Sequence, residues 1–246
     1  MRSSRSAADP LFAGTAGFAH RGLHGRDVCE NSLAAFQAAI DADVGIECDL
    51  RLSRDGFAMV FHDSSLERLC GVAVEMESLH AAALMHFRLS GSDQRIAWLG
   101  QLLALVDGRV PLLLELKRQG GRTQAGPPIG HLCAATLKAL RGYRGPVGIM
   151  SFDPRAVAWF ARHAPAVRRG LVVADRLSPV RRWGAMMLAD PQFLAVDRAA
   201  LGRAWVARAR RRIAVASWTI RTTAERETAA GRADALIWEA DGRPRA

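Results

Sequence analysis

The chain is short of lysine. Only Lys117 and Lys138 occur, so arginine supplies the rest of the 34 basic residues, and the formal net charge is +10. A charge of this size raises nucleic acid and acidic lipid as partners. The arginines are scattered along the chain, however, and only Arg208 to Arg212 form a dense run. A nucleic-acid footprint should gather on one face, so we expect no nucleic acid as a partner. The milder interpretation is a positive field that attracts a small anionic substrate.

Long apolar runs are also missing. No run approaches the roughly 18 residues that cross a bilayer. The first residues, MRSSRSAADPLFAGTAGF, include two arginines but lack the apolar stretch of about 7–15 residues that a signal peptide carries. We therefore expect a soluble, cytoplasmic protein without stable membrane insertion, in which residues 1–14 form a flexible N-terminal segment.

Paired cysteines are absent as well. Cys29, Cys48, Cys70 and Cys133 include no C-x-x-C motif, so neither a disulfide framework nor a zinc knuckle is indicated, and reduced thiols are expected. No internal repeat and no linker stands out. Residues 1–246 are interpreted as one domain, and the sequence leaves the oligomeric state open.

The chain does contain a steady alternation of apolar, strand-like segments and helical patterns. The strand-like segments end near His20, Asp49, Glu115, Met150, Val173, Asp197, Trp218 and Trp238. Helical patterns cover residues 30–42, 76–87, 96–106, 129–142, 154–164, 177–188, 199–211 and 222–230. Eight strands that alternate with helices are typical of an α/β protein of the (β/α)8 TIM-barrel class. A doubly wound sheet is the alternative, but no G-x-G-x-x-G turn follows any of these strands.

One further apolar run does not belong to the eight. Residues 57–61 (FAMVF) lie inside the second strand-to-helix connection and lead directly into His62-Asp63. We expect them to form an extra strand within a small insertion.

Residues capable of chemistry stand where the predicted strands end. The active sites of (β/α)8 barrels gather at the C-terminal ends of the strands. The residues placed there are His20, Glu47, Asp49, Glu115, Lys117 and Trp218.

Three of these residues are carboxylates that should face one another. Side chains two apart on a strand point the same way, so Glu47 and Asp49 share a face while Cys48 turns to the other side. Three carboxylates in a barrel mouth repel one another unless a cation lies between them. Oxygen ligands favour a hard ion, so the sequence predicts a Mg²⁺ or Ca²⁺ site that includes Glu115. Position 117 is a lysine, although almost every other basic residue of the chain is an arginine. This indicates that a compact point charge is needed there.

Taken in order, these motifs resemble the glycerophosphodiester phosphodiesterase family, which folds as a (β/α)8 barrel. The resemblance is carried by HRG at 20–22, EN at 30–31, E-x-D at 47–49, HD at 62–63 and E-x-K at 115–117. It extends through SF at 151–152 and WT at 218–219, and it is strongest over residues 16–63.

The resemblance implies a role for each position. Glu47, Asp49 and Glu115 would bind a divalent metal ion, His20 and His62 would be the acid/base pair, and Arg21 and Lys117 would hold phosphate oxygens. Trp218 is expected to form a wall for the glycerol moiety. Glu30 and Asn31 are supporting candidates, although either could serve only the start of the helix that follows, which Asn31 or Ser32 can cap.

The implied reaction is the metal-dependent hydrolysis of a glycerophosphodiester to glycerol 3-phosphate and an alcohol. A glycerol hydroxyl attacks the phosphorus, and water then opens the cyclic phosphate. The residue types suit this chemistry, because histidine exchanges protons near neutral pH and cationic groups stabilise charge on the phosphate oxygens.

The chain departs from the family pattern in places. Cys29 stands where proline is frequent, the region from Ser64 to Trp98 is short, and the last strand ends in Trp238-Glu239 where Thr-Asp is common. These positions lie in substrate-side loops and at the barrel closure, so they bear on substrate identity more than on the reaction.

Two other functions remain open. The same barrel could act on lysophospholipids, as a lysophospholipase D does, if an apolar trough adjoined the mouth. A catalytically silent barrel that binds anions or nucleic acid is the other alternative. The presence of both histidines and all three carboxylates weighs against the silent barrel.

Overall fold

The computed structural model describes residues 9–119 and 127–244, and its central feature is a closed barrel of eight parallel strands. The strands are β1 Phe18–Ala19, β2 Gly45–Leu52, β4 Leu112–Leu116, β5 Val147–Ser151, β6 Arg168–Val173, β7 Phe193–Asp197, β8 Ala214–Ile220 and β9 Ala235–Trp238. The short β1 pairs with both β2 and β9 and so closes the ring. The predicted (β/α)8 fold is confirmed, although β2 runs three residues beyond Asp49 to Leu52 and β8 runs two residues beyond Trp218 to Ile220.

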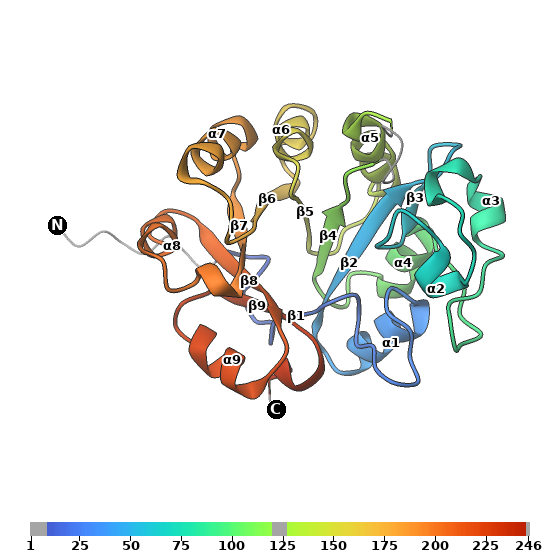
Figure 1. Ribbon diagram of the computed structural model, residues 1–246, viewed down its shortest axis with the longest axis horizontal. Coiled ribbons are helices and arrows are strands. Elements are labelled where there is room, and N and C mark those ends of the chain that lie inside the picture. The colour runs from blue at the N-terminus through green and yellow to red at the C-terminus, as the bar shows by residue number, and fades with distance from the viewer. Residues whose placement is uncertain (1–8, 120–126, 245–246) are drawn as a thin grey trace.

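Helices form an outer ring around these strands (Figure 1). They are α1 Leu33–Asp41, α4 Leu99–Val106, α5 Ile129–Ala139, α6 Pro154–His163, α7 Pro179–Ala189, α8 Ala204–Ala209 and α9 Thr223–Ala229. No helix in the described ranges is both long enough and apolar enough to cross a membrane.

Two predicted helices are broken in the structure. The pattern at 76–87 resolves into a 3-10 turn at Met76–Ser78 and the short α3 at Ala81–Leu84, because His80 is extended with φ −72° and ψ 151°. The pattern at 199–211 begins as a 3-10 turn at Arg198–Ala200, and α8 starts only after Gly202. Glycine disfavours the helix interior, which accounts for the second break.

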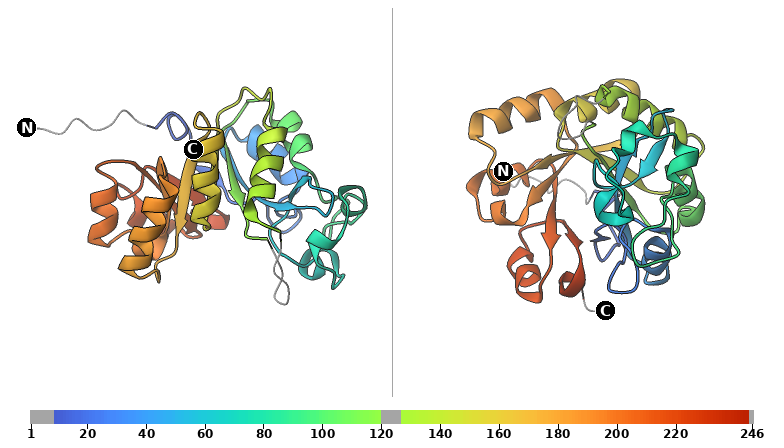
Figure 2. Two further views of the ribbon diagram at one scale, coloured as in Figure 1. Left: turned by 90° about the horizontal axis from the view of Figure 1, so that it is seen from above. Right: turned by 45° about the vertical axis from the view of Figure 1, so that its right-hand side comes forward.

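The extra strand predicted at residues 57–61 is present as β3, Ala58–Val60, and it pairs antiparallel with β2. It opens an insertion that also holds α2, Glu67–Cys70, and α3, and that stands beside the barrel wall (Figure 2). The insertion has an apolar core of its own, formed by Met59, Phe61, Leu66, Leu69, Met76, Ala81, Leu84, Leu89 and Ile96.

Strand β2 shows how the barrel separates its two faces. All of its residues are buried, yet Ile46, Cys48 and Leu50 pack outward with the helices while Glu47 and Asp49 point into the barrel. Below these carboxylates an apolar cluster fills the barrel interior, and it includes Phe18, Leu113, Met150, Val172 and Phe193. The polar residues at the mouth of the barrel therefore lie above a layer of apolar core side chains.

The segment expected to be flexible at residues 1–14 has two parts. Residues 1–8 lie outside the described residues. Leu11 and Phe12, by contrast, are buried and belong to the apolar cluster inside the barrel. The ring of Phe12 makes edge contacts with Phe18 and Phe193, with centroids 5.8 Å and 5.3 Å apart.

Candidate active site

The three predicted carboxylates meet at the mouth of the barrel. The parallel register pairs Asp49 on β2 with Glu115 on β4. One carboxylate oxygen each from Glu47, Asp49 and Glu115 lies within 4.8 Å of the other two. Their relative exposures are only 1 %, 0 % and 7 %. The structure thus confirms that the three side chains share one buried site.

Burial and neighbouring charges shift the pKa values of these three carboxyl groups in different directions. Burial raises the pKa of Glu47 to about 7, and the charge of Asp49 adds to the shift. Burial also raises the pKa of Glu115, against the opposing charge of Lys117. Burial alone would raise the pKa of Asp49 too, but Lys117 and Arg21 hold the pKa of that carboxyl well below its usual range.

A hard divalent cation fits this cluster. Oε1 of Glu47 is buried and has no hydrogen-bond partner among the described residues, and an unsatisfied buried acceptor costs free energy. A cation between the carboxylates would satisfy that oxygen and reduce their repulsion. The three side chains offer oxygen alone, which is the ligand that Mg²⁺ and Ca²⁺ prefer.

Two cationic side chains reach the same carboxylates. Nζ of Lys117 lies 2.5 Å from Glu115 Oε1 and 2.9 Å from Asp49 Oδ1. The backbone N–H of Arg21 donates to Glu47 Oε2 at 3.0 Å, and Nε of the Arg21 guanidinium lies 3.2 Å from Asp49 Oδ2. Both predicted phosphate-binding residues are therefore at the mouth.

The loop after β1 depends on Gly22. This residue has φ +81°, a conformation that glycine adopts without strain. A Cβ built there would lie 2.9 Å from both Ala35 Cβ and Phe36 Cδ1 of α1. The close approach of α1 explains why glycine follows His20-Arg21, and it fixes the direction of the loop that carries both residues.

The sequence left open whether Asn31 or Ser32 caps the first helix and whether Asn31 belongs to the site. In the structure the two residues have different roles. Ser32 caps α1, because its hydroxyl accepts a hydrogen bond from Ala35 N–H at 3.1 Å. Asn31 instead reaches the site, where Nδ2 donates to Asp49 Oδ2 at 2.9 Å. Glu30 also has a role beyond the helix end, since Nη1 of Arg21 donates to its Oε1 at 2.7 Å.

The first histidine, His20, has a carboxylate on each ring nitrogen. Nδ1 lies 2.6 Å from Oε2 of Glu239, and Nε2 lies 4.0 Å from Oε2 of Glu47. Burial alone would lower the pKa of His20, but the hydrogen bond to Glu239 and the charge of Glu47 outweigh it and raise that pKa. His20 therefore favours the protonated form.

The second histidine, His62, follows β3 on the insertion. Its Nδ1 lies 2.6 Å from Oδ1 of Asp63. Burial lowers the pKa of His62, and the charges of Lys117 and Arg21 lower it further, while Asp49 and Asp63 oppose this. The net shift is downward, so His62 favours the neutral form.

Sequence reasoning missed the residues that hold these partners in place. Glu239, named only as a departure at the barrel closure, is the partner of His20, and Nε of Arg221 donates to its other oxygen at 2.6 Å. Arg68 donates to Asp63 Oδ2 at 2.6 Å and to Glu30 Oε1 at 2.7 Å, which ties the insertion to the loop after β1. The only signal available was the position of Glu239 at the end of the last strand.

Trp218 stands apart from this cluster. It lies near the end of β8, donates its Nε1–H to Ala195 O at 3.0 Å and packs edge-on against Phe152, with centroids 5.4 Å apart. Among the described residues no interaction joins Trp218 to the histidines or the carboxylates. Phe152 is 46 % exposed, so the two rings offer an apolar edge on the β5–β8 side of the barrel.

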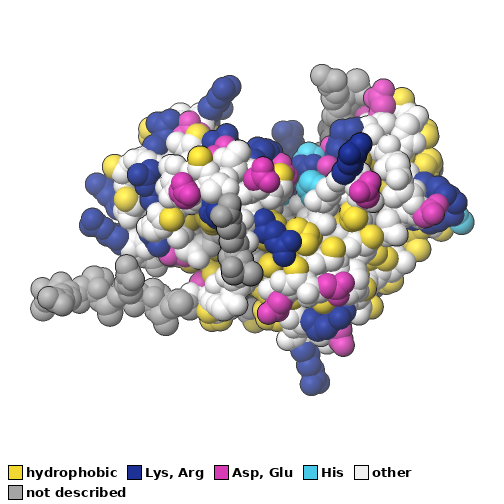
Figure 3. Space-filling view, turned by 90° about the horizontal axis from the view of Figure 1, so that it is seen from below, with side chains coloured by type: hydrophobic (Ala, Val, Ile, Leu, Met, Phe, Trp, Pro, Cys, Tyr) yellow, Lys and Arg dark blue, Asp and Glu magenta, His cyan; other side chains and the backbone are white. Residues whose placement is uncertain are grey.

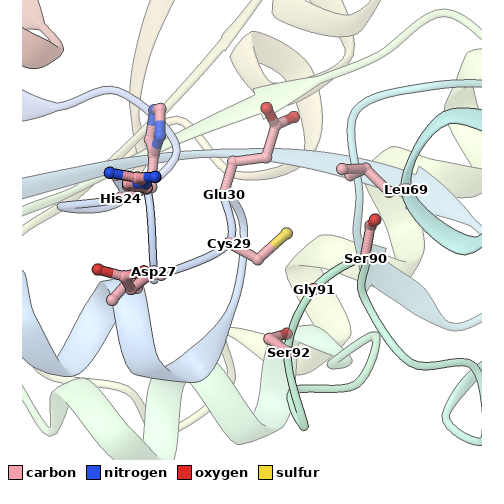
Figure 4. Close-up of a pocket in the computed structure, with 11 residues that line it drawn as sticks. His24, Asp27, Cys29, Glu30, Leu69, Ser90, Gly91 and Ser92 are labelled. Atoms are coloured by element: carbon pink, nitrogen blue, oxygen red, sulfur yellow. The ribbon is translucent and has the colours of Figure 1, made fainter.

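A cavity of about 220 Å³ lies between the loop after β1 and the insertion (Figure 4). Its lining includes His24, Asp27, Cys29 and Glu30 from the loop and Leu69, Ser90, Gly91 and Ser92 from the insertion. Seen from below, histidine side chains lie in the hollow between the two halves of the molecule, with acidic and basic side chains around them (Figure 3). Of the site residues described above, the lining of this cavity contains Glu30 alone.

The chain matches a family model over residues 20–238, that of the glycerophosphoryl diester phosphodiesterase family. The chain belongs to that family. The match spans both histidines and the three carboxylates, and it makes this protein a glycerophosphodiester phosphodiesterase by family.

Individual proteins are also similar to this chain. The Bacillus subtilis (strain 168) protein YqiK is 28 % identical over 185 residues, which are 70 % of this chain and 72 % of YqiK. Two solved structures share the phosphodiesterase fold. A phosphodiesterase from Oleispira antarctica in complex with the product sn-glycerol-3-phosphate has a TM-score of 0.77 and 20 % identity, with 92 % of this chain and 93 % of that chain covered. Glycerophosphodiester phosphodiesterase from Thermotoga maritima has a TM-score of 0.72 and 22 % identity, with 91 % and 94 % covered.

Proposed function

We propose that this phosphodiesterase hydrolyses glycerophosphodiesters to glycerol 3-phosphate and an alcohol, with a divalent metal ion bound by Glu47, Asp49 and Glu115. The observation that carries the proposal is the pairing of each histidine with its own carboxylate, beside one shared, buried carboxylate cluster. A proton donor and a proton acceptor are what the displacement of one alkoxide by another requires.

The metal ion, when bound, supplies positive charge that stabilises the phosphate oxygens and neutralises the carboxylate cluster. Arg21 and Lys117 are the side chains placed to hold further phosphate oxygens, because both already contact anionic oxygens at the mouth. Asn31 and Glu30 act as supports, since one holds Asp49 and the other holds Arg21.

We propose His62 as the base and His20 as the acid of the first step, in keeping with the opposite directions of their pKa shifts. Neutral His62 accepts the proton of the attacking glycerol hydroxyl, whose oxygen forms a new bond to phosphorus. The bond from phosphorus to the departing alcohol oxygen breaks, and protonated His20 gives its proton to that oxygen. The hydrogen bond from Glu239 supports the charged form of His20 whether or not a cation neutralises Glu47.

The second step runs the proton transfers in reverse. Neutral His20 takes a proton from water, whose oxygen bonds to phosphorus, and the ring bond of the cyclic phosphate breaks. Protonated His62 returns its proton to the glycerol hydroxyl. Glycerol 3-phosphate leaves, and both histidines regain their starting states.

Activity tests this proposal directly. EDTA-treated protein supplied with Mg²⁺ or Ca²⁺ should release glycerol 3-phosphate from glycerophosphocholine or a related ester, and EDTA should abolish the release. Assays on lysophosphatidylcholine separate the lysophospholipase D alternative. If a panel of glycerophosphodiesters gives no turnover with either ion, the substrate claim fails.

A further inference from the structure

Helix α7 carries apolar side chains on two faces. Ala185, Met186 and Ala189 pack toward the core, and a second apolar stripe faces away from it. Of its eleven residues, only Ala189 is buried. Four of the six large hydrophobic side chains that are exposed in the described part of the chain lie on it: Val180 at 80 %, Trp183 at 67 %, Met187 at 67 % and Leu188 at 48 %. A barrel helix normally turns its apolar stripe toward the strands.

The four side chains form one stripe. Their spacing of three, four, seven and eight residues places them on one face of an α-helix, opposite the buried Ala189. Gly184 lies within the same stripe and Arg181 lies at its edge. Figure 1 shows α7 on the outer rim of the barrel, between α6 and α8. A continuous exposed apolar face of this kind marks an interaction site.

The charge around this face is predominantly positive. Residues 154–213, which include α6, α7 and α8, contain thirteen arginines and three aspartates, so this segment carries a net +10, the whole net charge of the chain. The three helices themselves contain no acidic residue. The acids between them are partly neutralised, because Asp175 pairs with Arg203 and Asp190 with Arg169.

We propose that α7 is a docking surface for an anionic lipid bilayer, with the Val180–Leu188 stripe in the headgroup region and the surrounding arginines on acidic headgroups. A helix with a Trp-containing apolar face bordered by arginine is the chemistry that lies in a membrane interface without crossing it. A nucleic acid would match the arginines but not the apolar stripe. A second copy of this chain would match the stripe but repel through the arginines.

The binding does not depend on the proposed activity, because it is measured without substrate. Co-sedimentation with vesicles of phosphatidylcholine and phosphatidylglycerol (3:1) should capture the wild-type protein, pure phosphatidylcholine should capture far less, and added NaCl should weaken the capture because salt screens the charges. The variant Trp183→Gln/Met187→Gln should bind at least about ten-fold more weakly. Its hydrolysis of a water-soluble ester should equal that of wild type, since neither residue is part of the mouth.

Two controls make the result specific. Phe57→Gln removes another exposed aromatic ring, 43 % exposed and just before β3, and Arg54→Gln removes an exposed arginine from the same β2–β3 turn. Both variants should bind vesicles as wild type does. Arg181→Gln should bind anionic vesicles more weakly than Arg54→Gln. Vesicle binding that is absent in wild type or unchanged in Trp183→Gln/Met187→Gln would overturn the proposal. It would also be overturned by a wild-type dimer that this variant abolishes, or by duplex DNA binding to wild type with vesicle binding absent.

Discussion

His20 and His62 each have a carboxylate as hydrogen-bond partner, but the other groups around the two rings differ. Nδ1 of each ring lies 2.6 Å from a carboxylate, Glu239 for His20 and Asp63 for His62. Yet the pKa of His20 is raised and the pKa of His62 is lowered. His20 also faces the carboxylate of Glu47, whereas His62 lies within reach of the charges of Lys117 and Arg21. The carboxylate partner therefore does not set the pKa of a histidine alone. Burial lowers the pKa of both rings; the hydrogen bond to Glu239 and the charge of Glu47 outweigh it at His20, whereas the charges of Lys117 and Arg21 add to it at His62.

The largest effect that separates the two histidines should come from removing each in turn. His20→Ala and His62→Ala should each lower the turnover of glycerophosphocholine by about 10²–10⁴-fold, the usual contribution of a positioned acid or base. A glycerophospho-p-nitrophenol ester distinguishes them, because p-nitrophenolate leaves without a proton donor. On that ester His20→Ala should recover much of its activity and His62→Ala should not. Equal losses on both esters would break the assignment of acid and base.

Glu239 is the next point at which the comparison can be tested. Glu239→Gln should lower kcat by about 10–100-fold, as the loss of an orienting carboxylate partner does. The hydrogen bond from Glu239 raises the pKa of His20, so its loss lowers that pKa. The alkaline limb of the pH–rate profile, where the acid loses its proton, should move to lower pH. Asp241→Asn, two residues away and exposed, is the matched control and should leave the profile unchanged.

Asp63→Asn should lower kcat by a smaller factor, about 10-fold, and should shift the other limb of the pH–rate profile in the same direction. Its hydrogen bond raises the pKa of His62 against the stronger lowering influences. Without it that pKa falls further, so the acidic limb of the profile should move to lower pH. Asp93→Asn, which removes an exposed ion pair with Arg88 on the same insertion, serves as the control. An unchanged acidic limb in Asp63→Asn would show that the proton acceptor is another group.

The smallest effect concerns the carboxylates that lie between the two histidines. The folded-state pKa of Glu47 is about 7, against an ordinary value of 4.5. A raised folded pKa contributes stability that is present below the unfolded pKa and is lost as the pH rises through the folded one. Metal-free protein should therefore lose thermal stability between pH 4.5 and 7 more steeply than Glu47→Gln does. Mg²⁺ or Ca²⁺ should restore wild-type stability most at the upper end of this range.

The sequence predicted the barrel and most of its mouth because those features are local in the chain. Glu47 and Asp49 alternate with apolar residues on one strand, and Glu115 and Lys117 repeat the pattern on another, so strand geometry alone places them. Glu239 could not be assigned in this way. It lies 219 positions from His20, and only the pairing of β9 with β1 brings the two together.

The same limit applies elsewhere in the molecule. Arg68 contacts both Asp63 and Glu30 because of the way the insertion folds, and no periodic pattern in the sequence predicts these contacts. The pattern at 177–188 predicted a helix, but an apolar stripe does not reveal whether it faces the strands or the solvent. Local patterns therefore gave the elements, and the contacts between distant elements required the structure.

The central claim is that Glu47, Asp49 and Glu115 together bind one hard divalent cation. Calorimetric titration of metal-free protein with Mg²⁺ or Ca²⁺ tests it most directly, with wild type and Asp49→Asn compared side by side. Wild type should bind one ion per chain, and the variant should show no measurable binding. A wild-type protein that hydrolyses its ester while binding neither ion, or an Asp49→Asn variant that binds as tightly as wild type, would contradict it.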